Sequence, residues 1–195
     1  MSIVSLLVTF ALVDNVVLSR LLGINPPSGF PGSLRHAVAT GASTALIICA
    51  ASLGAWAVDG LALLPLGYGF LRTPVYVFLV AATAWLMAEA VRRVAPRLRP
   101  AFSFPEAAIN SAALGVVLLI RQGSASAAEG LVAGVAAGLG YALVMVILSA
   151  IRQRLEVEQV PRAMRGLPLQ LVSAGLLSLA FMAFDRAFLA RVLGG

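Results

Sequence analysis

The chain has 195 residues, of which 61% are hydrophobic and 11% are charged, and its formal net charge is +6. A water-soluble domain of this size could not cover its surface with so few charged side chains, so the composition indicates an integral membrane protein. All the basic residues are arginines, and they lack the interleaved aromatic residues of a nucleic-acid surface. We therefore expect the chain to lie in the lipid bilayer and not to bind nucleic acid.

Apolar segments of membrane-spanning length occur six times along the chain. They cover approximately residues 3–22, 36–58, 73–91, 102–120, 127–151 and 167–189. Each is close to the roughly 20 residues that an α-helix needs to cross about 30 Å of hydrocarbon. Because the connections are too short for a soluble domain, we expect an all-α, multi-pass membrane protein with a single domain over residues 1–195.

Polar residues interrupt the first and the fourth segments at corresponding places. Asn15 lies in LVDNVVLSRLLGINPPSG (residues 12–29), and Asn110 lies 95 positions later in FPEAAINSAALGVVLLI (residues 104–120). In membrane transport proteins, paired interruptions of this kind point to the functional centre. Asp14 is expected near the bilayer centre, where a carboxylate costs about 2.5 to 3.5 kcal/mol. Asp14, Asn15 and Asn110 are therefore candidates for an ion pathway, and the alternative is that they are hydrogen-bonded packing residues.

The sequence also indicates an internal repeat. The run RTPVYVFLVAATAWLMAEAVRR (residues 72–93) resembles GLPLQLVSAGLLSLAFMAFDRA (residues 166–187) at an offset of 94 positions. Three helices per half is an odd number, so two halves with the same fold must cross the membrane in opposite directions. This predicts a 3+3 inverted repeat with halves of about 1–95 and 96–195 and with interrupted first and fourth helices.

The arginines predict the orientation, because arginines in short loops stay on the cytoplasmic side. The loops after the first, third and fifth segments hold ten arginines, and the opposite side holds four. The four are Arg72, Arg121, Arg186 and Arg191. We therefore expect both termini outside the cytoplasm, which is the periplasmic side for the bacterial inner membrane in which we expect the chain to lie.

Small residues form a stripe in the fifth segment. Gly130, Gly134 and Gly138 recur at every fourth position. Such a stripe lets another helix approach closely, whether that helix belongs to this chain or to a partner.

Four runs of the sequence resemble a known family. The runs are LVDNVVLSRLLGINP, INSAALGVVLL, YALVMVILSAIRQRLEVEQVPRAMRG and LVSAGLLSLAFMAF, and the likeness spans essentially the whole chain. They resemble the RnfA family of the Rnf electron-transport complex, also called Rsx. NqrD and NqrE of the sodium-pumping NADH:quinone reductase are more distant matches. The resemblance implies a six-helix membrane protein, paired with an oppositely oriented sister similar to RnfE. It also implies a complex that couples electron transfer between ferredoxin and NAD to sodium or proton transport.

The resemblance further implies a [2Fe-2S] cluster shared by the two sister subunits. Its cysteine ligands belong to a Leu-Gly-x-Cys-Pro motif and a Thr-Asn-Cys-Ala motif, and cysteines of this kind bind iron as thiolates. In this chain Asn25 occupies the first cysteine position and Ser111 the second. An amide cannot replace a thiolate on iron, and a serine is a poor substitute. The only cysteine, Cys49, lies elsewhere, so we expect neither a cofactor nor a metal site in this chain.

Three functions fit these observations. The first, which the resemblance favours, is a subunit of an Rnf-like redox-driven ion translocase that has no catalytic residues of its own. The second is an inverted-repeat transporter or channel that binds an ion or small solute between Asn15 and Asn110. The third is a noncatalytic assembly scaffold.

Overall fold

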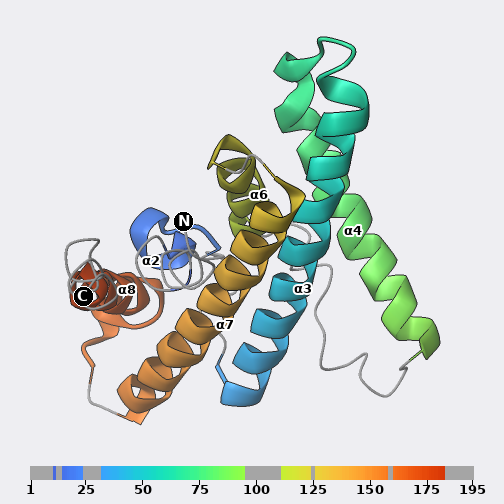
Figure 1. Cartoon of the computed structure of the whole chain (residues 1–195). Coiled ribbons are helices and arrows are strands. Elements are labelled where there is room, and N and C mark those ends of the chain that lie inside the picture. Colours follow the sequence, from blue (N-terminus) through green and yellow to red (C-terminus); the bar gives the residue numbers. More distant parts are fainter. Residues whose placement is uncertain are drawn as a thin grey trace, which may run out of the picture.

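The computed structural model describes residue 11 and residues 15–23, 32–94, 111–123, 126–157 and 160–182. Throughout these ranges the regular structure is helical, which confirms the expected all-α class (Figure 1). The α-helices are α2 (Val16–Arg20), α3 (Leu34–Val58), α4 (Arg72–Val94), α6 (Ser111–Gly123), α7 (Ala127–Val157) and α8 (Leu167–Phe181). A π-helical turn, Asp59–Leu63, extends α3, and short 3₁₀ turns, Gly69–Leu71 and Arg162–Met164, precede α4 and α8.

Three of the described helical stretches are long and apolar enough to cross a membrane. They are Leu34–Leu63, Gly69–Val94 and Ala128–Leu155. These stretches match the second, third and fifth predicted segments, while the shorter apolar helices α6 and α8 lie in the fourth and sixth. Of the first segment, the structure describes only Ala11 and the part from Asn15 onward. The chain is therefore a multi-pass membrane protein, and the number of six spans stays a prediction.

Helices α3 and α7 run antiparallel through the centre of the molecule (Figure 1). Small residues let their backbones approach: a Cβ on Gly41 would lie 2.9 Å from the Cα of Ala142. A Cβ on Gly138 would lie 3.0 Å from the Cα of Ala45, so the two contacts are reciprocal. In each helix the alanine follows the glycine by four positions. The predicted glycine stripe thus packs within this chain, and Gly134 continues it against Ser52.

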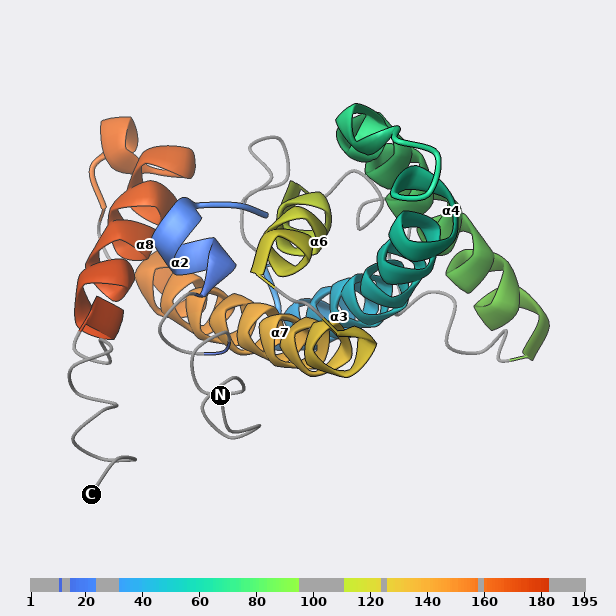
Figure 2. The ribbon, with the colours of Figure 1, turned by 45° about the horizontal axis from the view of Figure 1, so that its top comes forward.

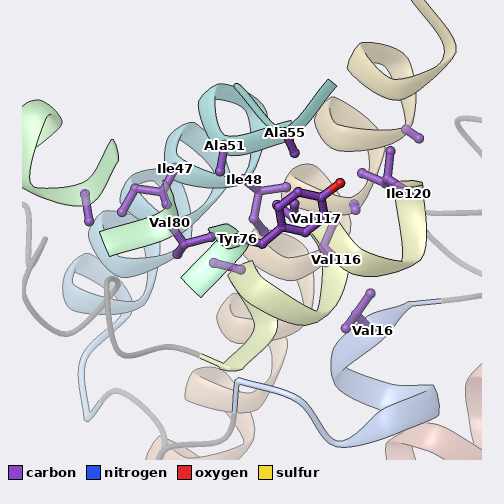
Figure 3. Close-up of a cluster of buried hydrophobic side chains, with 14 of the residues drawn as sticks. Val16, Ile47, Ile48, Ala51, Ala55, Tyr76, Val80, Val116, Val117 and Ile120 are labelled. Atoms are coloured by element: carbon purple, nitrogen blue, oxygen red, sulfur yellow. The ribbon is translucent and has the colours of Figure 1, made fainter. Parts of the chain in front are cut away.

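A cluster of buried apolar side chains joins α3, α4, α6 and α7 (Figure 3). Its largest fully buried members are Tyr76, Ile47, Ile48, Ile120, Val116 and Val117. The opposite face of α4 is open, because Phe78 is 76% exposed and Trp85 is 67% exposed. Large apolar side chains with this exposure suit a surface that faces lipid or another membrane protein.

A second buried cluster holds α2 between α8 on one side and α6 and α7 on the other (Figure 2). Val17 and Leu18 of α2 pack there with Tyr141 and Val144 of α7 and with Ala174 of α8. The Ser178 hydroxyl of α8 also donates a 2.9 Å hydrogen bond to the Leu18 carbonyl. This bond satisfies one of the carbonyl groups that the short helix α2 leaves open at its C-terminal end.

Connections that are expected on the same side of the membrane lie at the same end of the molecule. Just before α3, a Cβ on Gly32 would lie 3.7 Å from Nη2 of Arg152, near the C-terminal end of α7. At the other end of α3, Asp59 contacts Arg72 and Arg121. The first and fifth connections therefore adjoin at one end, and the second and fourth adjoin at the other, as an alternating membrane topology requires.

Candidate functional site

The interrupted first segment is organised around Asn15, which is buried, with 1% of its surface exposed. Its Oδ1 accepts a 3.1 Å hydrogen bond from the Val17 N–H and so caps the N-terminus of α2. Its Nδ2 donates a 2.9 Å hydrogen bond to the Ala11 carbonyl. The amide therefore satisfies backbone groups on both sides of the interruption, as a helix cap does. This bonding establishes a structural role for Asn15, and its place in an ion pathway stays a prediction.

The Asn15 side chain lies directly against α7 at Gly140. A Cβ on Gly140 would lie 2.9 Å from the Asn15 Nδ2 and 2.7 Å from the Ala11 carbonyl oxygen. Both distances are shorter than ordinary van der Waals contact with carbon, so the interrupted segment can approach this closely only where α7 has no side chain.

Helix α2 ends after five residues, and the chain then turns toward α6. Leu21 has a φ of 53° and Gly23 a φ of 85°, so two of the three residues after α2 adopt left-handed backbone. For a leucine this conformation costs about 1 to 2 kcal/mol, which surrounding contacts must offset. The turn brings the backbone of Gly23 to the beginning of α6.

The two interrupted segments meet at Gly23 and Ser111. The Gly23 N–H donates a 3.0 Å hydrogen bond to the Ser111 hydroxyl, across 88 positions of sequence. Gly23 is buried, whereas Ser111 is exposed, so the contact lies at the edge of the chain's surface. Gly23 lies two positions before Asn25 in the sequence, and Ser111 is the second expected cysteine position. The contact thus joins the two segments that carry these positions. Asp14, Asn25 and Asn110 themselves lie outside the described residues.

A second polar cluster, which the sequence pattern did not predict, lies at the end of α3. The Asp59 side chain is fully buried, and its Oδ2 accepts hydrogen bonds from Arg121 Nε and Nη2 at 3.1 and 2.9 Å. Its Oδ1 accepts a 3.1 Å hydrogen bond from Arg72 Nε. The Tyr76 hydroxyl is buried close to Asp59 and Arg121 and forms no hydrogen bond within the described residues. The ion pairs tie α6 and the start of α4 to the end of α3.

The positions of these three charged residues in the sequence could have indicated that they lie close together. Asp59 ends one apolar segment, Arg72 begins the next, and Arg121 ends the fourth, all on the same expected side of the membrane. An isolated carboxylate at such a boundary requires a cationic partner when it is buried. Sequence alone did not show which arginine would supply it.

Comparison with known proteins agrees with the whole-chain resemblance. The family described as "Rnf-Nqr subunit, membrane protein" matches residues 3–187. The chain is also 39% identical over 182 residues to the A subunit of the ion-translocating oxidoreductase complex of Edwardsiella ictaluri, covering 92% of this chain and 94% of that protein. The chain belongs to the Rnf-Nqr family.

Two further relatives carry the same name. The protein of Yersinia enterocolitica is 39% identical over 181 residues, covering 92% of this chain and 94% of the relative. The protein of Rhodobacter capsulatus is 39% identical over 180 residues, covering 91% and 93%. The resemblance to RnfA that the sequence suggested is thereby confirmed.

In this Rnf-Nqr protein, the residues at the two expected cysteine positions do not fit an iron–sulfur cluster. The Ser111 hydroxyl already accepts the Gly23 N–H, and Asn25 offers an amide. Cys49 lies on α3, where it adjoins Gly134 of α7. A [2Fe-2S] cluster requires thiolate ligands, or histidines in one variant, and this pair of positions supplies neither.

Proposed function

We propose that this chain is the RnfA component of an ion-translocating oxidoreductase complex, which couples electron transfer between ferredoxin and NAD to sodium or proton transport. The observation that carries this proposal is the 39% identity, over 92% of the chain, to proteins named for that component. The chain acts as a membrane subunit without catalytic residues of its own. Its partners are the other subunits of the complex, including a sister membrane protein similar to RnfE.

The proposed architecture is a 3+3 inverted repeat of six spans in the bacterial inner membrane, with both termini periplasmic. The reciprocal contacts of Gly41 with Ala142 and of Gly138 with Ala45 support it, because an offset of 97 positions relates each residue to its counterpart. A two-fold relation between the halves requires such pairs. The excess of arginines at one end supports the orientation.

The proposed ion pathway passes through the interrupted segments, at Asp14, Asn15 and Asn110. The burial of Asn15 supports this pathway, because polar residues within membrane segments face the protein interior rather than lipid. Broken helices supply the free backbone groups and polar side chains that membrane proteins use to coordinate ions. In this proposal, sodium ions or protons pass through this centre.

In this proposal the chain holds no [2Fe-2S] cluster, so electrons cross the complex by another route. The exposed position of Ser111 supports an approach of the sister subunit to this place. The test is the double variant Asn25→Cys and Ser111→Cys, expressed with a sister subunit that retains its own two cysteines. We expect the double variant to bind iron with the electron paramagnetic resonance signal of a reduced [2Fe-2S] cluster, and the unaltered chain to bind none.

Two controls make this result specific. Adding Cys49→Ser to the double variant should leave the iron content unchanged, because that cysteine lies on α3 beside α7. Equal iron in the unaltered pair of subunits would contradict the absence of a cluster. A double variant without iron would show that the two positions do not face the sister's cysteines.

The membership of the complex is tested by purifying the tagged chain from its native membrane in mild detergent. We expect flavin-binding and iron–sulfur subunits to copurify. Recovery of the chain alone, or only with copies of itself, would instead favour an independent transporter or channel. If deletion of the chain left electron transfer and ion transport intact once assembly was restored, the chain would be a scaffold.

A further inference from the structure

A cavity of about 360 Å³ lies between the C-terminal part of α7 and the N-terminal part of α8. Its apolar lining includes Leu148, Ile151, Leu155 and Leu169, and its charged lining is Arg152 and Arg165. The volume falls within the roughly 300 to 1,000 Å³ of small-molecule sites, and the mixture of apolar walls with a few polar groups is also typical of them.

The cavity lies at the C-terminal end of a membrane-spanning stretch and beside the start of the apolar helix α8. The membrane-spanning stretch of α7 ends at Leu155, and α8 begins at Leu167. The lining includes Arg152 and Leu155 from the last turn of this span and Arg165 and Leu169 from the other side of the connection. Phospholipid headgroups occupy this depth of a bilayer.

The charged side chains among the described residues of the cavity lining are both arginines. Among the described residues that line it, none is acidic. The Arg165 Nε donates a 2.9 Å hydrogen bond to the Val160 carbonyl, and its two Nη groups make no hydrogen bond or ion pair with the described residues. Arg152 has other contacts within the chain, but a guanidinium carries five N–H donors and can hold a phosphate oxygen alongside them. Arginine and phosphate form strong, often bidentate, charge-assisted hydrogen bonds.

We propose that this cavity binds an anionic phospholipid, with the headgroup phosphate held by Arg152 and Arg165 and the upper part of an acyl chain against the leucines. Basic pockets between membrane helices bind anionic headgroups in this way. The proposal requires only that the chain spans a membrane, so it does not depend on the redox role.

The test uses the full chain, purified in mild detergent within whatever complex it forms, and then supplied with phosphatidylglycerol or phosphatidylcholine. Bound lipid is counted by mass spectrometry, and the melting temperature is measured with each lipid. We expect phosphatidylglycerol alone to be retained and to raise the melting temperature. The variant Arg152→Gln with Arg165→Gln should weaken phosphatidylglycerol binding at least about tenfold, because it removes two charge-assisted contacts.

The matched control is Arg154→Gln, because Arg154 is exposed on the same helix but does not line the cavity. It should bind phosphatidylglycerol like the unaltered chain. If the double variant does not fold, the exposed Arg165 is changed alone: Arg165→Gln should lose lipid, and Arg165→Lys should retain it. Equal retention by the Gln and Lys variants, or equal retention of both lipids, would overturn the proposal.

Inorganic phosphate distinguishes the two sources of the same chemistry. It should neither raise the melting temperature as phosphatidylglycerol does nor displace the lipid. A stabilisation by inorganic phosphate that equals that of the lipid would assign the cavity to a free anion and overturn the assignment to phospholipid.

Discussion

The backbone N–H of Gly23 and the hydroxyl of Ser111 form a 3.0 Å hydrogen bond that joins the two interrupted segments of the chain. Gly23 follows α2, and Ser111 begins the described part of α6. The bond therefore fixes the position of the first half relative to the second at the place where the resemblance puts the family's cofactor.

Replacing Ser111 with alanine should destabilise the chain by about 1 to 3 kcal/mol, because the buried Gly23 N–H loses its acceptor. The measurement is the free energy of unfolding in mixed detergent micelles. Thr83→Ala is the control, since the Thr83 hydroxyl bonds only the Val80 carbonyl of its own helix. Equal losses in the two variants would show that the contact between the segments contributes nothing of its own.

Replacing Gly140 with alanine should force the interrupted segment away from α7. The new Cβ would meet the Ala11 carbonyl oxygen at 2.7 Å, and both groups belong to backbone that cannot easily shift. We expect a loss of about 1 to 3 kcal/mol in unfolding free energy. Gly175→Ala on α8 is the matched control, because its Cβ would meet nothing within 4 Å. A Gly140 variant as stable as the Gly175 variant would contradict the observed packing.

Replacing Asp59 with asparagine should cost about 3 to 5 kcal/mol, because it leaves Arg121 largely buried without its counter-charge. Adding Arg121→Gln should restore part of the lost stability, since the second change removes the uncompensated charge. Glu89→Gln is the control, because the arginines that pair with Glu89, Arg92 and Arg93, are exposed. The change at Glu89 should have a much smaller effect on the melting temperature. An additive double variant would show that the pair is not coupled.

Replacing Asp14 with asparagine should reduce ion transport more than it reduces assembly. A carboxylate that carries an ion or proton loses this ability as an amide of nearly the same shape. Sodium uptake or proton transport is measured in membrane vesicles and divided by the yield of purified complex. Unchanged transport per complex would remove Asp14 from the pathway.

The sequence predicted the long helices well because their apolar runs have clear ends. The expected segment 36–58 is observed as Leu34–Val58, and the expected segment 73–91 as Arg72–Val94. Helix α7 continues to Val157, beyond the expected end at residue 151. The residues that follow Ile151, such as Arg152 and Gln153, are polar but favour helix, so loss of hydropathy did not mark the helix end.

Contacts between distant residues were less accessible to sequence reasoning. The pattern located the interruption at Asn15, but it could not show that the amide bonds both Ala11 and Val17. The bond between Gly23 and Ser111 depends on the left-handed turn after α2, and a leucine at Leu21 gives no warning of such a turn. Tertiary packing determines both features.

The reciprocal glycine contacts of α3 and α7 also limit where ions can travel. At Gly41 and Gly138 the space between the helices does not admit even one additional methyl group. A water molecule needs a cavity of at least about 10 to 15 Å³ and polar partners, so no water fits between the two helices at these glycines. A hydrated ion therefore cannot cross between α3 and α7 at Gly41 and Gly138.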